Sequence, residues 1–237
     1  LLGDPRMAAQ ECDCDFSTSG DIVFYPEYIE YYEKSTFIEI LAARSFFKNR
    51  LKESSECNLV LSCLLHILHG NRPYALSRRS HPITPYAPTG AYDYKELIPR
   101  LRNKVNKSLV QLSTENLSKS YIFEQDVLKK WPSTVNDIDL ILTSPPFFDS
   151  TKYYLTNWIR NWFIGWEMED FSTKKDNFVD TIQKSNLSIY NDIFTKCKSV
   201  LNPKGSVVFH LGKSKKLDMG NELLLKARSI FNSVELY

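Results

Sequence analysis

The sequence predicts an α/β fold in which a mainly helical region precedes a doubly wound parallel sheet. Three apolar runs in the second half carry this prediction, because residues 121–124, 138–142 and 206–211 have the length and side chains of strands. Segments with helical spacing lie between and after them, and such alternation is typical of a parallel sheet. Helical spacing dominates the first half, so we divide the chain into residues 1–115 and 116–237.

The first half is predicted to hold three helices and one long loop. Residues 26–52 and 55–69 carry apolar side chains at helical spacing, and the run Gly70-Asn71-Arg72-Pro73 stops the second helix. Helix-breaking residues interrupt the segment 73–93, which predicts an ordered surface loop. Helical spacing returns over residues 94–112.

In the second half, helices are expected to alternate with the strands. They are predicted over residues 153–166, 174–201 and 221–231, and a last strand begins near Ser233. The run Asn202-Pro203-Lys204-Gly205 ends the longest helix, because proline and glycine terminate helices. The carboxyl ends of parallel strands share one edge of the sheet, where open α/β sheets bind their ligands.

The composition is that of a globular protein in a reducing compartment. Of 237 residues, 43% are hydrophobic and 24% are charged, and the net charge is +2. No apolar run reaches the roughly 18 residues of a membrane span, and the first residues do not resemble a signal peptide. We therefore expect no membrane association and a cytoplasmic location. Five cysteines without regular spacing predict neither disulfides nor a metal site.

Basic residues gather locally although the net charge is small. Between residues 72 and 107, eight lysines and arginines face only two acidic residues. Such an excess can neutralise phosphates, so residues 1–115 are predicted to contact DNA. The side chains expected to do so are Arg78, Arg79, Arg100 and Arg102. A solvated basic face is the competing interpretation.

The run Thr143-Ser144-Pro145-Pro146-Phe147 directly follows an apolar strand. The exocyclic amine of cytosine or adenine is a poor nucleophile, because its lone pair is delocalised into the ring. The Ser144 hydroxyl and a proline-fixed carbonyl can accept hydrogen bonds from this amine and favour its attack on a methyl sulfonium. The ring of Phe147 offers a face for a flipped-out base, and Lys152 follows at the rim of this expected pocket.

The run from Asp139 to Phe148 resembles motif IV of the amino-methylating DNA methyltransferases, the N4-cytosine and N6-adenine family. Asp126 resembles the acid of that family that contacts the adenine amine of the cofactor. Residues 201–205 resemble the Leu-x-Pro-Gly-Gly turn of the family, with lysine in place of one glycine. The resemblance covers about residues 121–211, and the serine form of the motif is more often associated with N4-cytosine.

The resemblance implies a Rossmann-like class I methyltransferase sheet with an additional helical region. It implies S-adenosyl-L-methionine as cofactor and DNA as partner, with methylation of N4 of cytosine favoured over N6 of adenine, as in a restriction–modification system. The residues implied for catalysis are Ser144, Pro145, Pro146 and Phe147, and those implied for cofactor binding are Asp126 and Thr143.

One feature of the family is missing from this sequence. The family has a glycine-rich Phe-x-Gly-x-Gly cofactor loop, whereas no two of the eight glycines here are separated by a single residue. Because such a loop lets the backbone approach the cofactor closely, we expect it upstream of Leu1. Two other interpretations stay open, an RNA methyltransferase and a cofactor-free nucleic-acid-binding protein derived from a methyltransferase.

Overall fold

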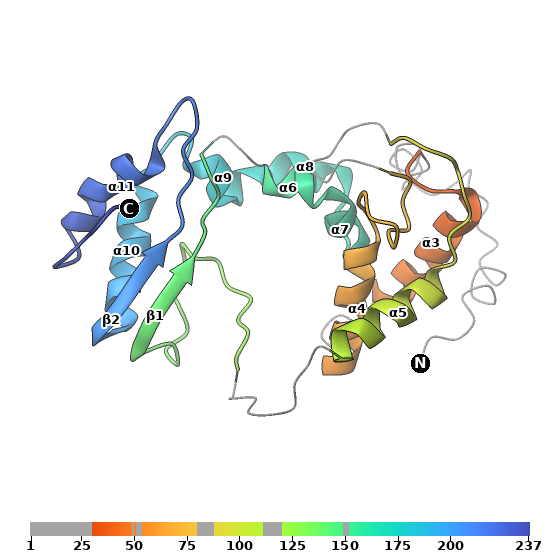
Figure 1. The fold of residues 1–237 in the computed structure, drawn as a ribbon, viewed down its shortest axis with the longest axis horizontal. Helices are drawn as coiled ribbons and strands as arrows, with labels where there is room; N and C mark the ends of the chain where they lie inside the picture. The colour runs from red at the N-terminus through yellow and green to blue at the C-terminus, as the bar shows by residue number, and fades with distance from the viewer. Residues whose placement is uncertain (1–29, 49, 51–53, 80–87, 111–119, 149–151) are drawn as a thin grey trace. The chain divides into compact units, whose positions relative to one another are not determined.

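The computed structural model describes residues 30–48, 50, 54–79, 88–110, 120–148 and 152–237 (Figure 1). The chain divides into two units. The N-terminal unit holds Leu1–Ser118 and Tyr154–Ser172, and the sheet unit holds Lys119–Tyr153 and Thr173–Tyr237. The sequence predicted a division into residues 1–115 and 116–237. It did not predict that Tyr154–Ser172, from the second half of the chain, belongs to the first unit.

Helices build the N-terminal unit. They are α3 (Lys34–Lys48), α4 (Ser55–Ile67), α5 (Leu97–Val110), α7 (Trp158–Phe163) and α8 (Met168–Thr173). Helix α4 begins where Ser54 Oγ accepts a hydrogen bond from the backbone N–H of Cys57 at 3.1 Å, which is an N-cap. The first N–H of α5 is bonded to a side chain of α3, because Leu97 donates to the buried carboxylate of Glu39 at 2.7 Å.

The three helices predicted over residues 26–52, 55–69 and 94–112 are confirmed as α3, α4 and α5. Their bounds are shorter than expected, and residues 26–29, 49, 51–53 and 111–112 lie outside the described residues. The core is apolar and aromatic, and its fully buried members include Ile40, Phe47, Leu64 and Ile67. No described helix combines the length and the apolar character that crossing a membrane requires.

His69 is a titratable side chain buried at this core. It is 6% exposed, its ring lies 5.9 Å from that of Tyr31, and its Nε2 has no hydrogen-bond partner among the described residues. Burial, together with the charge of Arg160, lowers the pKa of His69 to about 4. Because the folded pKa is lower than the unfolded one, its contribution to stability is present above the unfolded pKa and is lost as pH falls towards 4.

We therefore expect His69→Phe to flatten the loss of stability on acidification. The free energy of unfolding, measured with urea at pH 7 and pH 4.5, should fall less in the variant than in the wild type. His66→Phe is the comparison, because His66 is exposed and stacks on Tyr74, a contact that phenylalanine retains. Partial burial lowers the pKa of His66 as well, so this variant should flatten the acid loss in the same direction but less than His69→Phe. Equal acid losses in His69→Phe and the wild type would contradict the prediction.

The sheet unit is built around two parallel strands, β1 (Ile138–Thr143) and β2 (Leu201–Phe209). Its helices are η2 (Lys175–Asn177), α9 (Val179–Ile182), α10 (Ile189–Val200) and α11 (Met219–Arg228), and the short α6 (Tyr153–Thr156) lies at the unit boundary. Helices α10 and α11 cover one face of the sheet, where Ile141, Val207 and Phe209 pack on a buried core (Figure 1). The α/β class is thus confirmed in its coarse form.

Two predicted strands are absent from the part of the chain that the structure describes. Residues 121–124 and 233–237 form no ladder, and Ile122 is 99% exposed. A strand needs a neighbouring strand for its backbone groups and a layer for its apolar side chains, whereas residues 121–124 pair with no described strand and leave their side chains exposed. Within the described residues the sheet has two strands. Its second face carries the exposed side chains of Leu140, Leu142 and Val208.

The two long predicted helices of this half are interrupted. Residues 153–166 form α6 and α7, and residues 174–201 form η2, α9 and α10. Between α9 and α10, the side-chain oxygen of Asn186 accepts the N–H of Ser188 at 2.9 Å. Such side-chain bonds compete with the helical pattern, so the polar run 183–188 breaks a helix that its periodicity alone would continue.

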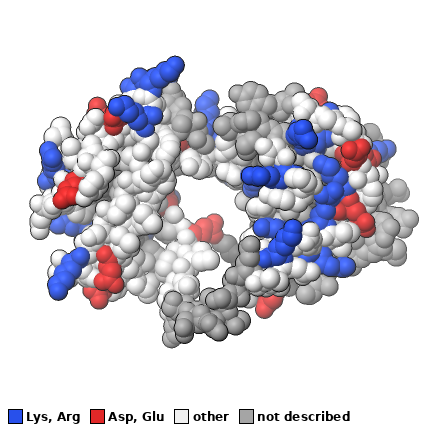
Figure 2. Space-filling model, viewed as in Figure 1, with Lys and Arg blue, Asp and Glu red and all other residues white. Residues whose placement is uncertain are grey.

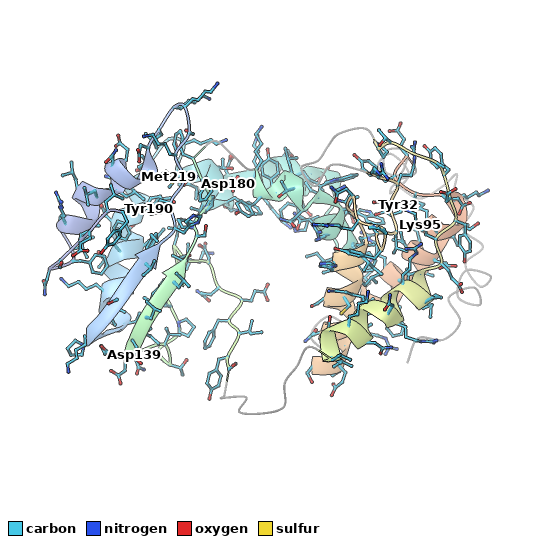
Figure 3. The ribbon with its side chains drawn as sticks, in the orientation of Figure 1. Tyr32, Lys95, Asp139, Asp180, Tyr190 and Met219 are labelled. Carbon is cyan, nitrogen blue, oxygen red and sulfur yellow. The ribbon has the colours of Figure 1, made fainter. Side chains whose placement is uncertain are left out.

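The predicted turn at 202–205 lies inside β2 as an irregularity. Ile138 pairs with Leu201 and Leu140 pairs with Ser206, so residues 202–205 bulge opposite a single residue, Asp139. The Asn202 amide donates to the carboxylate of Asp139 (Figure 3). Gly205 is required there, because a Cβ would lie 2.5 Å from the carbonyl oxygen of Ile138.

Candidate functional site

The carboxyl ends of β1 and β2 bring Ser144 and His210 together. Thr143 and Phe209 are the last register pair, and the N–H of His210 donates to the carbonyl of Thr143 at 2.9 Å. One residue beyond, Ser144 Oγ lies 3.3 Å from His210 Nδ1. Both side chains are exposed. The hydroxyl of the motif therefore stands in solvent at the sheet edge with an imidazole as its neighbour.

Phe147 is packed against the segment that follows β2. Its ring meets that of His210 edge-on, with centroids 5.5 Å apart and an interplanar angle of 65°. It also lies directly over Gly212, where a Cβ would come within 2.3 Å of Phe147 Cγ. Only a residue without a side chain leaves room for this ring. The next residue is fixed as well, because the N–H of Phe148 contacts Met219 Sδ at 3.2 Å.

The second proline of the motif is anchored to the core. Gln183 Nε2 donates to the carbonyl of Pro146 at 3.1 Å, and Tyr190 Oη donates to Gln183 Oε1 at 2.8 Å. Gln183 is 1% exposed and Tyr190 0%, so both bonds are shielded from competing water. This relay from Tyr190 through Gln183 to Pro146 fixes the inner side of the motif, and Pro145 lies before it, half-buried.

A buried carboxyl group lies where the chain leaves the motif. Asp180 Oδ2 accepts the N–H of Tyr153 at 3.3 Å, whereas Asp180 Oδ1 has no hydrogen-bond partner among the described residues (Figure 3). The side chain is 2% exposed, and burial raises the pKa of Asp180. Because the folded pKa exceeds the unfolded one, this group's stabilising contribution is present below the unfolded pKa and is lost as pH rises through the folded pKa.

Asp180→Asn is therefore expected to stabilise the sheet unit more at pH 7 than at pH 4. The amide keeps the acceptor for the Tyr153 N–H and carries no charge at either pH, so the desolvation cost of the carboxylate disappears. Urea unfolding of both proteins at the two pH values measures the difference. Asp176→Asn, at an exposed carboxylate in η2, is the control, and an equal gain at both pH values would refute the expectation.

Asp126 lies on an anchored turn of the sheet unit. Its Oδ1 accepts the N–H of Leu128 at 2.9 Å, and the side chain is exposed. The following residue is tied to the core, because Lys196 Nζ and Trp131 Nε1 each donate to the carbonyl of Val127 at 3.1 Å. One carboxylate oxygen is thus used to shape the turn, and the exposed carboxylate can meet a ligand amine.

Two of the predicted DNA-contacting arginines serve the fold of the N-terminal unit. Arg78 donates to the carbonyls of Gly90 and Glu30 at 2.8–3.0 Å, and its guanidinium lies 3.9 Å from the ring centroid of Tyr92. Arg100 donates to the carbonyl of Pro73 at 2.8 Å. These bonds order the loop after α4. They also occupy guanidinium N–H groups that could otherwise donate to a phosphate.

Other basic side chains remain exposed. Arg79 and Arg102 are exposed in the N-terminal unit, and Figure 2 shows Lys and Arg side chains over the region of α4 and α5. Lys152 is exposed in the sheet unit. The loop that follows His210 carries Lys213, Lys215 and Lys216, of which Lys213 pairs with Asp218 at 3.0 Å. Exposed lysines thus lie in the loop that follows β2, the strand whose carboxyl end carries His210.

A cavity of about 800 Å³ lies elsewhere in the sheet unit. It is bounded by β2, α11 and the C-terminal segment, and Leu201, Gly205, Leu223 and Leu236 are among its lining residues. Ser144 and His210 do not line it. Ser144 and His210 thus lie outside this cavity, at the carboxyl ends of β1 and β2.

Sequence reasoning missed His210, Gly212, Gln183 and Tyr190. The positions of His210 and Gly212 just after a predicted strand were a signal that could have been used, because residues that follow neighbouring parallel strands share one edge of the sheet. Gln183 and Tyr190 carried no such signal, because both lay within one predicted helix, residues 174–201.

The chain matches no protein-family model, no curated protein and no solved structure.

Proposed function

We propose that this protein is an S-adenosyl-L-methionine-dependent methyltransferase that methylates an exocyclic amino nitrogen in DNA, N4 of cytosine in preference to N6 of adenine. The observation that carries the proposal is the Ser144 hydroxyl at the carboxyl edge of parallel strands, followed by a proline pair anchored to the core. We further propose that β1 and β2 belong to a Rossmann-like class I methyltransferase sheet.

The chemistry assigned to the motif is hydrogen-bond acceptance. The target amine has two N–H groups, and withdrawing them from the plane of the ring restores its nucleophilic lone pair. Ser144 Oγ receives one of them. The carbonyl of Pro146 is already bonded to Gln183, so we assign the second to the carbonyl of Pro145. Because these acceptors are positioned before the amine arrives, they lower the barrier without reorganisation.

The residues present fit one end of the proposed cofactor. Asp126 offers an exposed carboxylate on a rigid turn, suited to an adenine amine, and Thr143 lies at the end of β1. When bound, the cofactor would supply the methyl group on a positively charged sulfur. The sequence contains no Gly-x-Gly loop for the methionine end.

DNA is the proposed partner because each of the two units exposes basic side chains. Lys152, Lys215 and Lys216 are exposed in the sheet unit, and Arg79 and Arg102 are exposed in the N-terminal unit. These side chains can contact phosphates. Arg78 and Arg100 are assigned a supporting role, because their guanidinium groups bond to loop carbonyls.

One observation favours a second candidate, a cofactor-free nucleic-acid-binding protein. The absence of a Gly-x-Gly loop from the sequence removes the backbone surface that the methionine end of the cofactor uses.

The deciding experiment combines binding and transfer. Calorimetry measures affinity for S-adenosyl-L-methionine, and the protein is then incubated with the labelled cofactor and unmethylated DNA or RNA. We expect binding, label in DNA, and N4-methylcytosine after digestion to nucleosides. DNA binding without cofactor binding or transfer would establish the second candidate, and label only in RNA would identify an RNA methyltransferase.

A further inference from the structure

The exposed contact between Ser144 and His210 has a chemical consequence for the proposed reaction. A serine hydroxyl has one proton to donate and two lone pairs to accept with. An amine that must attack an electrophile needs acceptors for its N–H groups, whereas a hydroxyl proton pointed at its nitrogen would engage the lone pair that attacks. The Ser144 hydroxyl therefore requires a separate acceptor for its own proton.

We propose that His210 is a positioning residue whose Nδ1 accepts the hydroxyl proton of Ser144 and thereby turns the lone pairs of Ser144 Oγ towards the target amine. The proposal rests on the proposed function for the identity of that amine. The separation of 3.3 Å between Ser144 Oγ and His210 Nδ1 permits the bond. It requires the neutral imidazole with its proton on Nε2.

Two contacts of His210, and one further contact of Phe147, hold the imidazole in place for this role. The backbone N–H of His210 is bonded to the carbonyl of Thr143 at 2.9 Å, which ties the two strand ends together. Phe147 meets the ring edge-on at 5.5 Å, and Phe147 is itself held over Gly212. The orientation of the hydroxyl is thus set by side chains of the motif and of the segment after β2.

The test uses two replacements of opposite character. His210→Phe keeps an aromatic ring beside Phe147 and removes the acceptor, so kcat for methyl transfer should fall by about tenfold, the scale of one hydrogen bond. His210→Asn places an amide oxygen near the position of Nδ1 and should restore most of this loss. The KM for S-adenosyl-L-methionine should not change in either variant.

A double-mutant cycle separates positioning from a general structural effect. If His210 acts through Ser144, then His210→Phe should have no further effect on kcat in a Ser144→Ala background. Additive losses, or a His210→Asn variant as impaired as His210→Phe, would overturn the proposal. Circular dichroism checks that each variant is folded, which the exposed position of His210 favours.

A spectroscopic measurement keeps this inference distinct from the proposed function. Long-range ¹H–¹⁵N correlation spectra report the tautomer of each of the four histidines, and His210→Phe assigns the signal. The wild type should hold His210 with its proton on Nε2, and Ser144→Ala should shift its Nδ1 resonance. No shift would refute the contact whatever the activity. A shift in a protein that transfers no methyl group would refute the proposed function, and with it the amine as the target.

Discussion

Ser144→Ala is expected to lower kcat for methyl transfer to DNA by roughly 10- to 1000-fold, the scale of losing one preorganised hydrogen bond to a reacting group. The hydroxyl lies exposed at the carboxyl end of β1, so its removal leaves no buried cavity. Affinity for S-adenosyl-L-methionine should remain, because the Ser144 side chain is assigned to the amine and not to the cofactor. Single-turnover kinetics with labelled cofactor measure the step.

Ser206→Ala is the matched control for this experiment. Ser206 is also an exposed serine of the sheet unit, but it pairs with Leu140 inside the ladder, away from the carboxyl edge. Transfer should be unchanged in this variant. A Ser144→Ala protein with wild-type kcat would remove the assigned role of the hydroxyl.

Gly212→Ala is expected to reduce the free energy of unfolding by about 1–3 kcal/mol, the cost of overpacking a filled space. The new methyl group would lie 2.3 Å from Cγ and 2.8 Å from Cβ of Phe147. Those atoms are close to the backbone, so the whole ring must move and cannot simply rotate away. The displaced ring would also leave its edge contact with His210. Urea unfolding followed by circular dichroism measures the loss.

Gly220→Ala provides the comparison. There the nearest neighbour of an added Cβ is Leu236 Cδ1 at 2.9 Å, the far end of a side chain that can turn aside. Alanine also favours the helix α11 in which Gly220 lies. We expect the stability of this variant to remain close to that of the wild type, and equal losses at the two glycines would contradict the argument.

Secondary structure was predictable where local pattern and tertiary packing agree. Helix α4 was expected over residues 55–69 and β1 over residues 138–142, and both lie there with bounds shifted by at most two residues. The expected helix over residues 174–201 failed because the side chains of Asn186 and Ser188 bond within a turn. The strand at 121–124 failed because a strand depends on a partner that local sequence does not contain.

The consecutive residues of the candidate site were predictable from the sequence, but its residues distant in sequence were not. The motif from Thr143 to Phe147 was recognisable because its residues are consecutive and their chemistry is specific. His210 and Gly212 are distant in sequence, and only the strand register brings them to Ser144 and Phe147. Arg78 was likewise noticed for its charge alone, and its bonds to the carbonyl of Gly90 depend on a fold that local sequence does not contain.

The relay from Tyr190 through Gln183 to Pro146 places two constraints on Tyr190. Its ring must fill the core, and its hydroxyl must hold Gln183 against the motif. An ordinary core position accepts a replacement of the same shape, and phenylalanine would fill the space of Tyr190 while losing only the hydroxyl that bonds to Gln183. Such an exchange would preserve folding yet loosen the carbonyl of Pro146. If the motif is under selection for its reaction, evolution should therefore retain the hydroxyl of Tyr190 more strictly than its volume alone would require.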